Sequence, residues 1–123
     1  MIGGFQLYSK VSLISRGEEK EEEVFNTQTW RLLKAIEEKK SLKKAALSLN
    51  ISYRKAWGDI KKVEKYLASD IVKISRGGKN GGETILTSFG KKWLRAYARF
   101  QKNSKLRVER SYQSFLKEIT SIG

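Results

Sequence analysis

Cationic side chains gather in the segment 52–69, which begins Ser-Tyr-Arg-Lys. Arg54 and Lys55 stand near its start, and Lys61 and Lys62 follow about two helical turns later. Guanidinium and ammonium groups bind phosphate oxygens, and the arginine fork also matches the O6 and N7 acceptors of guanine. These residue types predict a surface for a polyanion rather than a centre for covalent chemistry.

The charge of the whole chain favours the same kind of partner. Lys and Arg number 26 against 13 Asp and Glu, which gives a net charge of +13. Residues 1–25 hold five glutamates against three cations, so the surplus lies in the rest of the chain. So large a surplus repels itself unless a polyanion is near. Its partner could be DNA, RNA or an anionic membrane, and the alternative is a solvated surface that only aids solubility.

The residue types that are missing exclude most catalytic chemistry. The sequence has neither Cys nor His, which removes disulfides, thiol catalysis, and the commonest general base and transition-metal ligand. The glutamate-rich run 18–23 could chelate a cation, but we expect a solvated linker because metal ligands must converge from different directions. We therefore expect no enzyme, no cofactor and no metal site.

The sequence also gives no sign of a membrane or an export signal. It has no run of about 18 apolar residues, the length a membrane helix needs, and its N-terminus lacks the apolar core of a signal peptide. We expect a cytoplasmic protein without membrane contact.

Apolar residues recur at helical spacing in three successive segments. The spacing predicts helices at 27–40, 41–50 and 52–69. Ser41 and Ser52 are expected as N-caps of the second and third helices, and Asn50 as a left-handed residue that ends the second. Only two or three residues separate these two helices, which is typical of a helix-turn-helix.

The third predicted helix has two different flanks. At about 100° per residue, one flank collects the apolar residues Ala56, Ile60, Val63 and Leu67. The outward positions carry Arg54, Lys55, Gly58, Lys61, Lys62 and Lys65. Gly58 lowers helix stability by about 1 kcal/mol relative to Ala. It either lets the helix approach a DNA groove closely, or marks a tight helix–helix contact or a tolerated defect.

The start of this helix is expected nearest the bases. The major groove is about 12 Å wide and admits one α-helix, and the N-terminal residues of a recognition helix enter it first. The candidates are Ser52, Tyr53, Arg54 and Lys55. Arg54 is the best candidate for reading guanine, whereas Tyr53 can instead pack against Trp57.

A glycine-rich hairpin is predicted after the three helices. Strands are expected at 71–74 and 84–86, and four glycines lie between them. Arg76, Lys79 and Asn80 at this tip are candidates to contact a phosphate or the minor groove. A phosphate-binding P-loop is not expected, because no Gly-Lys-Ser/Thr follows and the loop precedes a strand rather than a helix.

The two ends of the chain complete the predicted fold. The stretch 4–15 favours one strand or a hairpin, and 16–23 a charged loop. Thr87 is expected to cap a last helix, whose apolar stripe is Phe89, Trp93, Tyr97, Phe100, Val108, Tyr112, Phe115 and Ile119. Unbroken, this helix would span about 50 Å, more than its own domain can bury. It must either break near 102–105 or meet a second copy.

The expected fold is therefore α+β, mostly α: a winged helix-turn-helix with an N-terminal strand and a long C-terminal dimerisation helix. Its parts are a strand region with an acidic linker at 1–25, the winged helix-turn-helix at 26–86, and the dimerisation helix at 87–123.

Several motifs in this order resemble one known family. The most specific are Ile51-Ser52-Tyr53-Arg54-Lys55-Ala56-Trp57 and Gly77-Gly78-Lys79-Asn80-Gly81-Gly82, followed by Leu86-Thr87-Ser88-Phe89-Gly90. They resemble the N-terminal DNA-binding domain of the ModE family of molybdate-responsive transcription regulators and, more distantly, the LysR family. The resemblance implies a winged helix-turn-helix that dimerises through its N-terminal strand and last helix and binds an operator.

The resemblance also implies which residues meet DNA. They are Ser52, Tyr53, Arg54 and Lys55 at the recognition-helix start, and Arg76, Lys79 and Asn80 in the wing. The family often has Asp where this chain has Gly58, so a different operator is possible. The chain stops at Gly123 without the family's molybdate-binding domains, so we do not expect molybdate to regulate it.

Three functions remain open at this point. The first is a dimeric transcriptional regulator that binds double-stranded DNA at specific sites. The second is a sequence-nonspecific chromatin or architectural protein, which the charge also favours. The third is a docking scaffold for protein or RNA.

Overall fold

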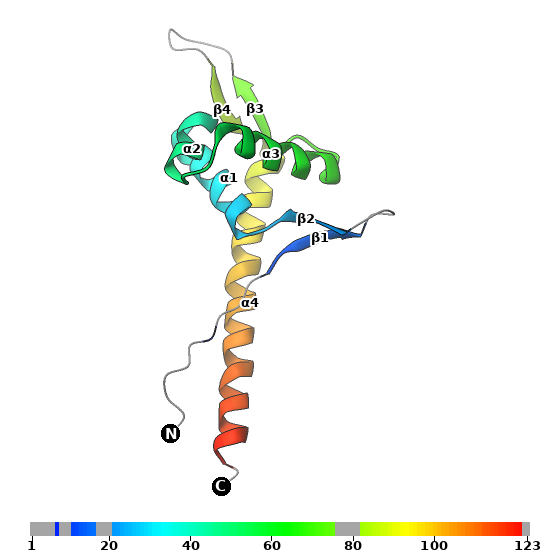
Figure 1. The fold of residues 1–123 in the computed structure, drawn as a ribbon, viewed down its shortest axis with the longest axis vertical. Coiled ribbons are helices and arrows are strands. Elements are labelled where there is room, and N and C mark those ends of the chain that lie inside the picture. The colour runs from blue at the N-terminus through cyan, green and yellow to red at the C-terminus, as the bar shows by residue number, and fades with distance from the viewer. Residues whose placement is uncertain (1–6, 8–10, 17–20, 76–81, 122–123) are drawn as a thin grey trace.

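The computed structural model describes residue 7 and residues 11–16, 21–75 and 82–121. In chain order the elements are β1 (Leu13–Arg16), β2 (Glu21–Phe25), α1 (Thr27–Lys39), α2 (Leu42–Ser48), α3 (Tyr53–Leu67), β3 (Val72–Ser75), β4 (Glu83–Leu86) and α4 (Ser88–Thr120). Figure 1 shows α1 to α3 and the strands gathered around the start of α4, which then extends away from them as a rod. We call residues 21–75 and 82–97 the head.

The predicted helix starts are confirmed by their capping bonds. The hydroxyl of Ser41 accepts the N–H of Lys44 at 3.1 Å, and the hydroxyl of Ser52 accepts that of Lys55 at 3.0 Å. Each satisfies an N–H that has no partner inside its own helix. Asn50 has a φ of 57°, the left-handed conformation expected at the turn between α2 and α3. Local capping chemistry therefore fixes the helix-turn-helix geometry.

The apolar flank of α3 is buried as predicted. Ala56, Ile60 and Val63 are fully buried, and Leu67 is half-buried. They pack in one core with the buried apolar residues of α1 and α2, among them Leu33, Leu42 and Ala45. Burial of apolar side chains is the main stabilising term in folding, so this core fixes which flank of α3 faces outward.

A carboxylate joins the end of α3 to β3. Glu64 is only 9% exposed, and its Oε2 accepts the N–H groups of Ile71 at 2.9 Å and Val72 at 3.4 Å. Its Oε1 lies 3.3 Å from the Lys61 ammonium. Buried carboxylates need such partners. Glu64 therefore positions β3, which with β4 forms the strands of the wing, against α3.

The wing strands pair antiparallel, with Val72 opposite Leu86 and Ser75 opposite Glu83. The N–H of Thr84 donates to the carbonyl of Lys40 at 3.0 Å, which ties β4 to the end of α1. Residues 76–81 lie outside the described residues, and with them Arg76, Lys79 and Asn80.

The N-terminal hairpin differs from its prediction. Among the described residues β1 occupies Leu13–Arg16 and pairs antiparallel with β2, so the loop expected at 16–23 is wrong for residues 16 and 21–23. Glutamates are poor strand formers, but here tertiary contacts decide. Phe25 is 1% exposed, and the Glu22 carboxylate accepts the Tyr66 hydroxyl of α3 at 2.7 Å. Contacts with α3 thus anchor an acidic strand.

The last helix is continuous, so the break considered near 102–105 is wrong. α4 runs 33 residues without a break at 102–105. Its first turns belong to the head, because the Phe25 ring packs edge-on against Tyr97 at 4.6 Å and Trp93 at 5.5 Å between centroids. Burial raises the pKa of the Tyr97 hydroxyl above its ordinary value, so this residue stays neutral in the cluster.

The beginning of α4 also lies very close to Ile71, the residue before β3. A Cβ added at Gly90 would lie 2.2 Å from the carbonyl oxygen of Ile71, which requires glycine at this position. Nowhere among residues 21–75 and 82–121 does a helix carry an apolar stretch long enough to cross a membrane.

Candidate nucleic-acid interface

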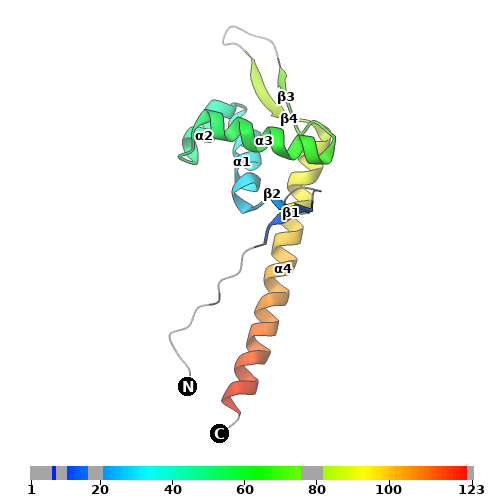
Figure 2. The same cartoon turned by 45° about the vertical axis from the view of Figure 1, so that its right-hand side comes forward.

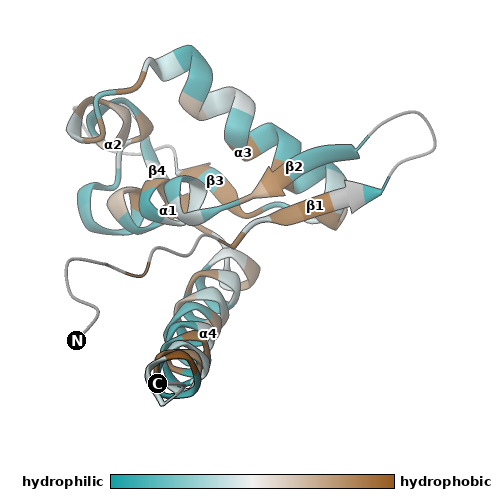
Figure 3. Cartoon of the chain, turned by 60° about the horizontal axis from the view of Figure 1, so that its bottom comes forward, coloured by the Kyte–Doolittle hydropathy of each residue, from teal (hydrophilic) through white to brown (hydrophobic). Residues whose placement is uncertain are grey.

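The start of α3 lies on the outer surface of the head. Ser52, Arg54 and Lys55 are exposed, and Tyr53 is 51% exposed. Figure 3 shows α3 along the margin of the head, with mostly hydrophilic residues on it. The side chains predicted to approach bases are therefore accessible, because the opposite flank of the helix is held in the core.

One side of α3 carries a pair of contacting aromatic rings. The Trp57 indole N–H donates to the Tyr53 hydroxyl at 2.7 Å, and the two rings meet edge to face at 6.4 Å. The Lys61 ammonium lies 4.9 Å from the centre of the Trp57 ring. Tyr53 therefore packs against Trp57, the alternative considered for it from the sequence.

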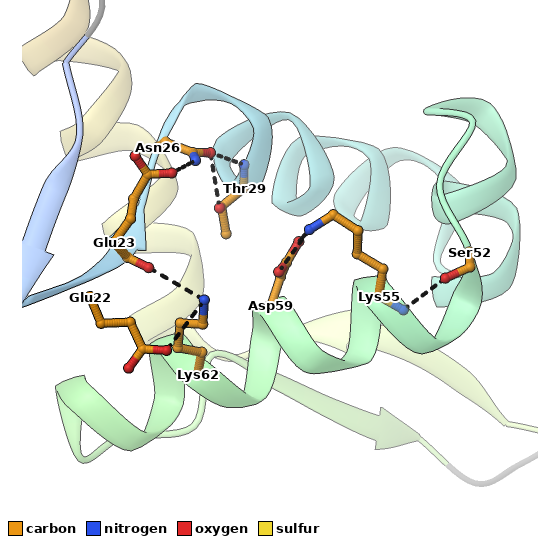
Figure 4. A network of polar contacts seen from close by, with 8 residues as sticks. All are labelled: Glu22, Glu23, Asn26, Thr29, Ser52, Lys55, Asp59 and Lys62. Atoms are coloured by element: carbon orange, nitrogen blue, oxygen red, sulfur yellow. Dashed lines mark hydrogen bonds and ion pairs between the residues drawn. The ribbon is translucent and has the colours of Figure 1, made fainter. Parts of the chain in front are cut away.

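The other side of α3 carries paired charges, drawn in Figure 4. The Lys55 ammonium lies 3.2 Å from the carboxylate of Asp59, one turn along the same helix. The Lys62 ammonium lies 3.6 Å from the Glu22 carboxylate and donates to the Glu23 carbonyl at 3.4 Å. Exposed pairs of this kind contribute about 0–1 kcal/mol, so a phosphate group could replace either carboxylate.

The predicted cations of α3 therefore differ in their surroundings. Within the described part of the chain, Arg54 is exposed and has no acidic partner, whereas Lys55, Lys61 and Lys62 each have one. Of these four predicted cations, Arg54 is thus the most available to a new anionic or base partner.

Gly58 faces open space. A Cβ added there would meet nothing within 4 Å. The tight helix–helix contact considered for this glycine is therefore wrong. A close approach to a groove stays a prediction.

Lysines before α3 were overlooked in the sequence. Lys43 and Lys44 of α2, Lys39 at the end of α1 and Lys40 after it are all exposed. In a helix-turn-helix the first helix crosses the DNA backbone, a rule that could have singled them out. Lys39 and Lys44 line an open hollow of about 440 Å³ together with Leu47 and Ser48. These lysines widen the cationic surface beyond α3.

The elements define a winged helix-turn-helix of the α+β class, mostly α. A solved structure with a similar fold is ArgP from Mycobacterium tuberculosis, with a TM-score of 0.50 and 19% sequence identity. The similarity covers 68% of this chain and 29% of that one. No family model matches the sequence.

Curated relatives confirm the resemblance to ModE regulators. The transcriptional regulator ModE of Haemophilus influenzae is 36% identical over 67 residues, which are 54% of this chain and 26% of that protein. The DNA-binding transcriptional dual regulator ModE of Escherichia coli K12 is 33% identical over 66 residues, 54% of this chain and 25% of that protein.

A third relative carries a different name. The molybdenum-pterin-binding protein MopB of Rhodobacter capsulatus is 38% identical over 66 residues, 54% of this chain and 24% of that protein. The chain thus spans only about a quarter of the length of the relatives it matches.

Proposed function

We propose that this chain is a transcriptional regulator that binds double-stranded DNA as a dimer, with α3 in the major groove. The observation that carries the proposal is the accessible cationic start of α3, with the opposite flank of the helix buried in the core. The regulators named ModE that match over 54% of the chain support it. Their regulatory names also support a role other than catalysis.

The residues of α3 would have separate roles. Arg54 would form the bidentate contact with guanine, while Ser52 and Tyr53 would lie beside the bases. Lys55 and Lys62 would exchange their carboxylate partners for phosphates. Lys61 would add a phosphate contact, and Gly58 would allow close approach.

The wing would supply a second contact with the same duplex. Arg76, Lys79 and Asn80 would meet the backbone or the minor groove. Backbone contacts fix position and affinity, whereas base contacts fix sequence, so the wing and α3 are expected to respond differently to substitution.

A second copy of the chain would cover the apolar surface that this copy leaves exposed. Leu13, Trp93, Ala96, Tyr97 and Phe100 line an apolar hollow of about 260 Å³. The indole N–H of Trp93 is buried there without a hydrogen-bond partner among the described residues. Phe100 and Phe115 are 43% and 53% exposed. Such surface is typical of an interface, and β1 lies beside it.

The test compares two arginine substitutions that each remove one positive charge. Arg54→Ala should weaken binding to a selected site by about 1–3 kcal/mol and relax one base position. Arg107→Ala, on the exposed surface of α4, should relax none. If the two variants bind selected and random duplexes alike, α3 is not the reading helix.

A wing substitution tests the other contact. Lys79→Ala should weaken all sequences similarly and lower the slope of log K against log salt by about 1. A parent protein that binds selected and random duplexes equally would instead favour the sequence-nonspecific architectural role.

A further inference from the structure

A large share of the positive charge lies on α4, where the proposed recognition surface does not reach. Ser88–Thr120 contains nine Lys and Arg against two Glu. Six of the cations lie on one side of the helix at about 100° per residue: Lys92, Arg95, Arg99, Lys102, Arg110 and Lys117. We call these six the α4 stripe. All of them are exposed.

The α4 stripe is nearly free of acidic partners. Arg95 lies 3.1 Å from the Glu37 carboxylate of α1. In the part of the chain that the structure describes, the other five cations form no ion pair with an acid. Exposed, unpaired cations along one helix repel one another, so they favour an anionic partner along the whole helix.

The α4 stripe lies on the opposite side of the helix from the apolar surface. At about 100° per residue, Lys102 and Arg110 fall on the far side from Tyr97, Val108 and Phe115. A second copy seated on the apolar surface would therefore leave the α4 stripe facing outward in each protomer.

We infer that the α4 stripe binds the phosphate backbone of a second segment of double-stranded DNA, independently of sequence, so that the protein bridges two duplexes. The inference rests on the proposed function for the first duplex, which α3 would hold. It also gives a role to the cations of the α4 stripe, which recognition by α3 and the wing does not involve.

The chemistry of the α4 stripe favours a duplex over other polyanions. Single strands are held on aromatic platforms, but the aromatic rings of α4 lie on its other side. A membrane-bound helix buries its apolar side among lipid headgroups, which here would turn these cations away from the lipid. A duplex needs only spaced cations, since its phosphates place a negative charge about every 1.7 Å along its axis.

The shape of the molecule favours a second segment rather than the first. Figures 1 and 2 both show α4 leading away from α3, so that its C-terminal end lies far from the wing strands. Its 33 residues extend about 50 Å at 1.5 Å per residue. Because DNA resists bending over about 150 base pairs, a short duplex held on α3 would not follow α4.

A capture experiment tests this bridging. The full chain is bound to an immobilised random duplex of about 25 base pairs, well below the persistence length of DNA, and then offered a labelled duplex of the same length. The double variant Lys102→Gln/Arg110→Gln should bind the first duplex normally but capture the second at least about fivefold less, since two phosphate contacts are lost. Lys105→Gln/Arg107→Gln removes the same two charges from α4 outside the α4 stripe and should capture like the parent.

Equal capture by the two double variants would overturn the inference, with circular dichroism confirming that both remain helical. Single-stranded RNA or anionic phosphatidylserine vesicles that displace the second duplex better than unlabelled duplex does would also overturn it. Failure of the proposed function is distinguishable, because Arg54→Ala would then bind a selected site as tightly as the parent does.

Discussion

The two halves of α4 have the same apolar spacing but opposite surroundings. In the first half Gly90, Leu94 and Tyr97 are buried in the head. From residue 98 to residue 121 no residue is buried, although Phe100 and Phe115 continue the stripe. Periodicity therefore predicts that a helix has a face to bury, but not whether its own chain or a second copy will cover that face.

The largest difference between the two halves should appear in unfolding. Phe25→Ala removes the ring that packs on Tyr97 and Trp93, and should lower the free energy of unfolding by about 3–5 kcal/mol. Phe115→Ala, at a position 53% exposed, should change it by much less in dilute protein. Urea denaturation of both variants at low protein concentration measures this. Equal losses of unfolding free energy would contradict the account that only the first half of α4 is packed in the head.

The two helical glycines sharpen the same contrast between packed and open positions. Gly90→Ala should lower the free energy of unfolding by about 1–3 kcal/mol, because the added methyl overlaps the Ile71 carbonyl. Gly58→Ala should raise it by about 0.5–1 kcal/mol, since the methyl enters open space and alanine favours the helix. Thermal unfolding compares them, and a stabilised Gly90→Ala protein would show that α4 does not start against Ile71.

The smaller effect concerns association of the exposed half. Phe115→Ala should weaken self-association about tenfold, which corresponds to about 1.4 kcal/mol. Gln113→Ala, on the other side of the helix, serves as the control and should leave association unchanged. Sedimentation equilibrium at several concentrations measures both variants. Identical association constants would place the dimer interface elsewhere.

Features that depend on interactions within a few residues could be predicted from the sequence. Ser41, Ser52 and Asn50 mark the ends of α2 and α3, and the spacing of Ala56, Ile60 and Val63 predicts the buried flank of α3. The exposure of Arg54 follows from that flank. These features depend on helix geometry and capping, which the chain encodes locally.

Contacts between distant segments could not be predicted in this way. Glu22 belongs to a strand because Lys62 and Tyr66 of α3 hold it. Glu64 accepts the backbone N–H groups of Ile71, just before β3, and of Val72 in β3. Side-chain spacing does not reveal such contacts. Likewise, Gly90 is required by the carbonyl of Ile71, whose approach depends on how two elements pack.

Selection of bound sequences from random duplex DNA, at stated salt, tests the central claim most directly. If two copies each place α3 in the major groove, the recovered sites should share a motif repeated with two-fold symmetry, its halves centred about 34 Å apart, one helical turn of DNA. Recovered sequences without a common motif, bound no more tightly than the starting pool, would contradict the claim.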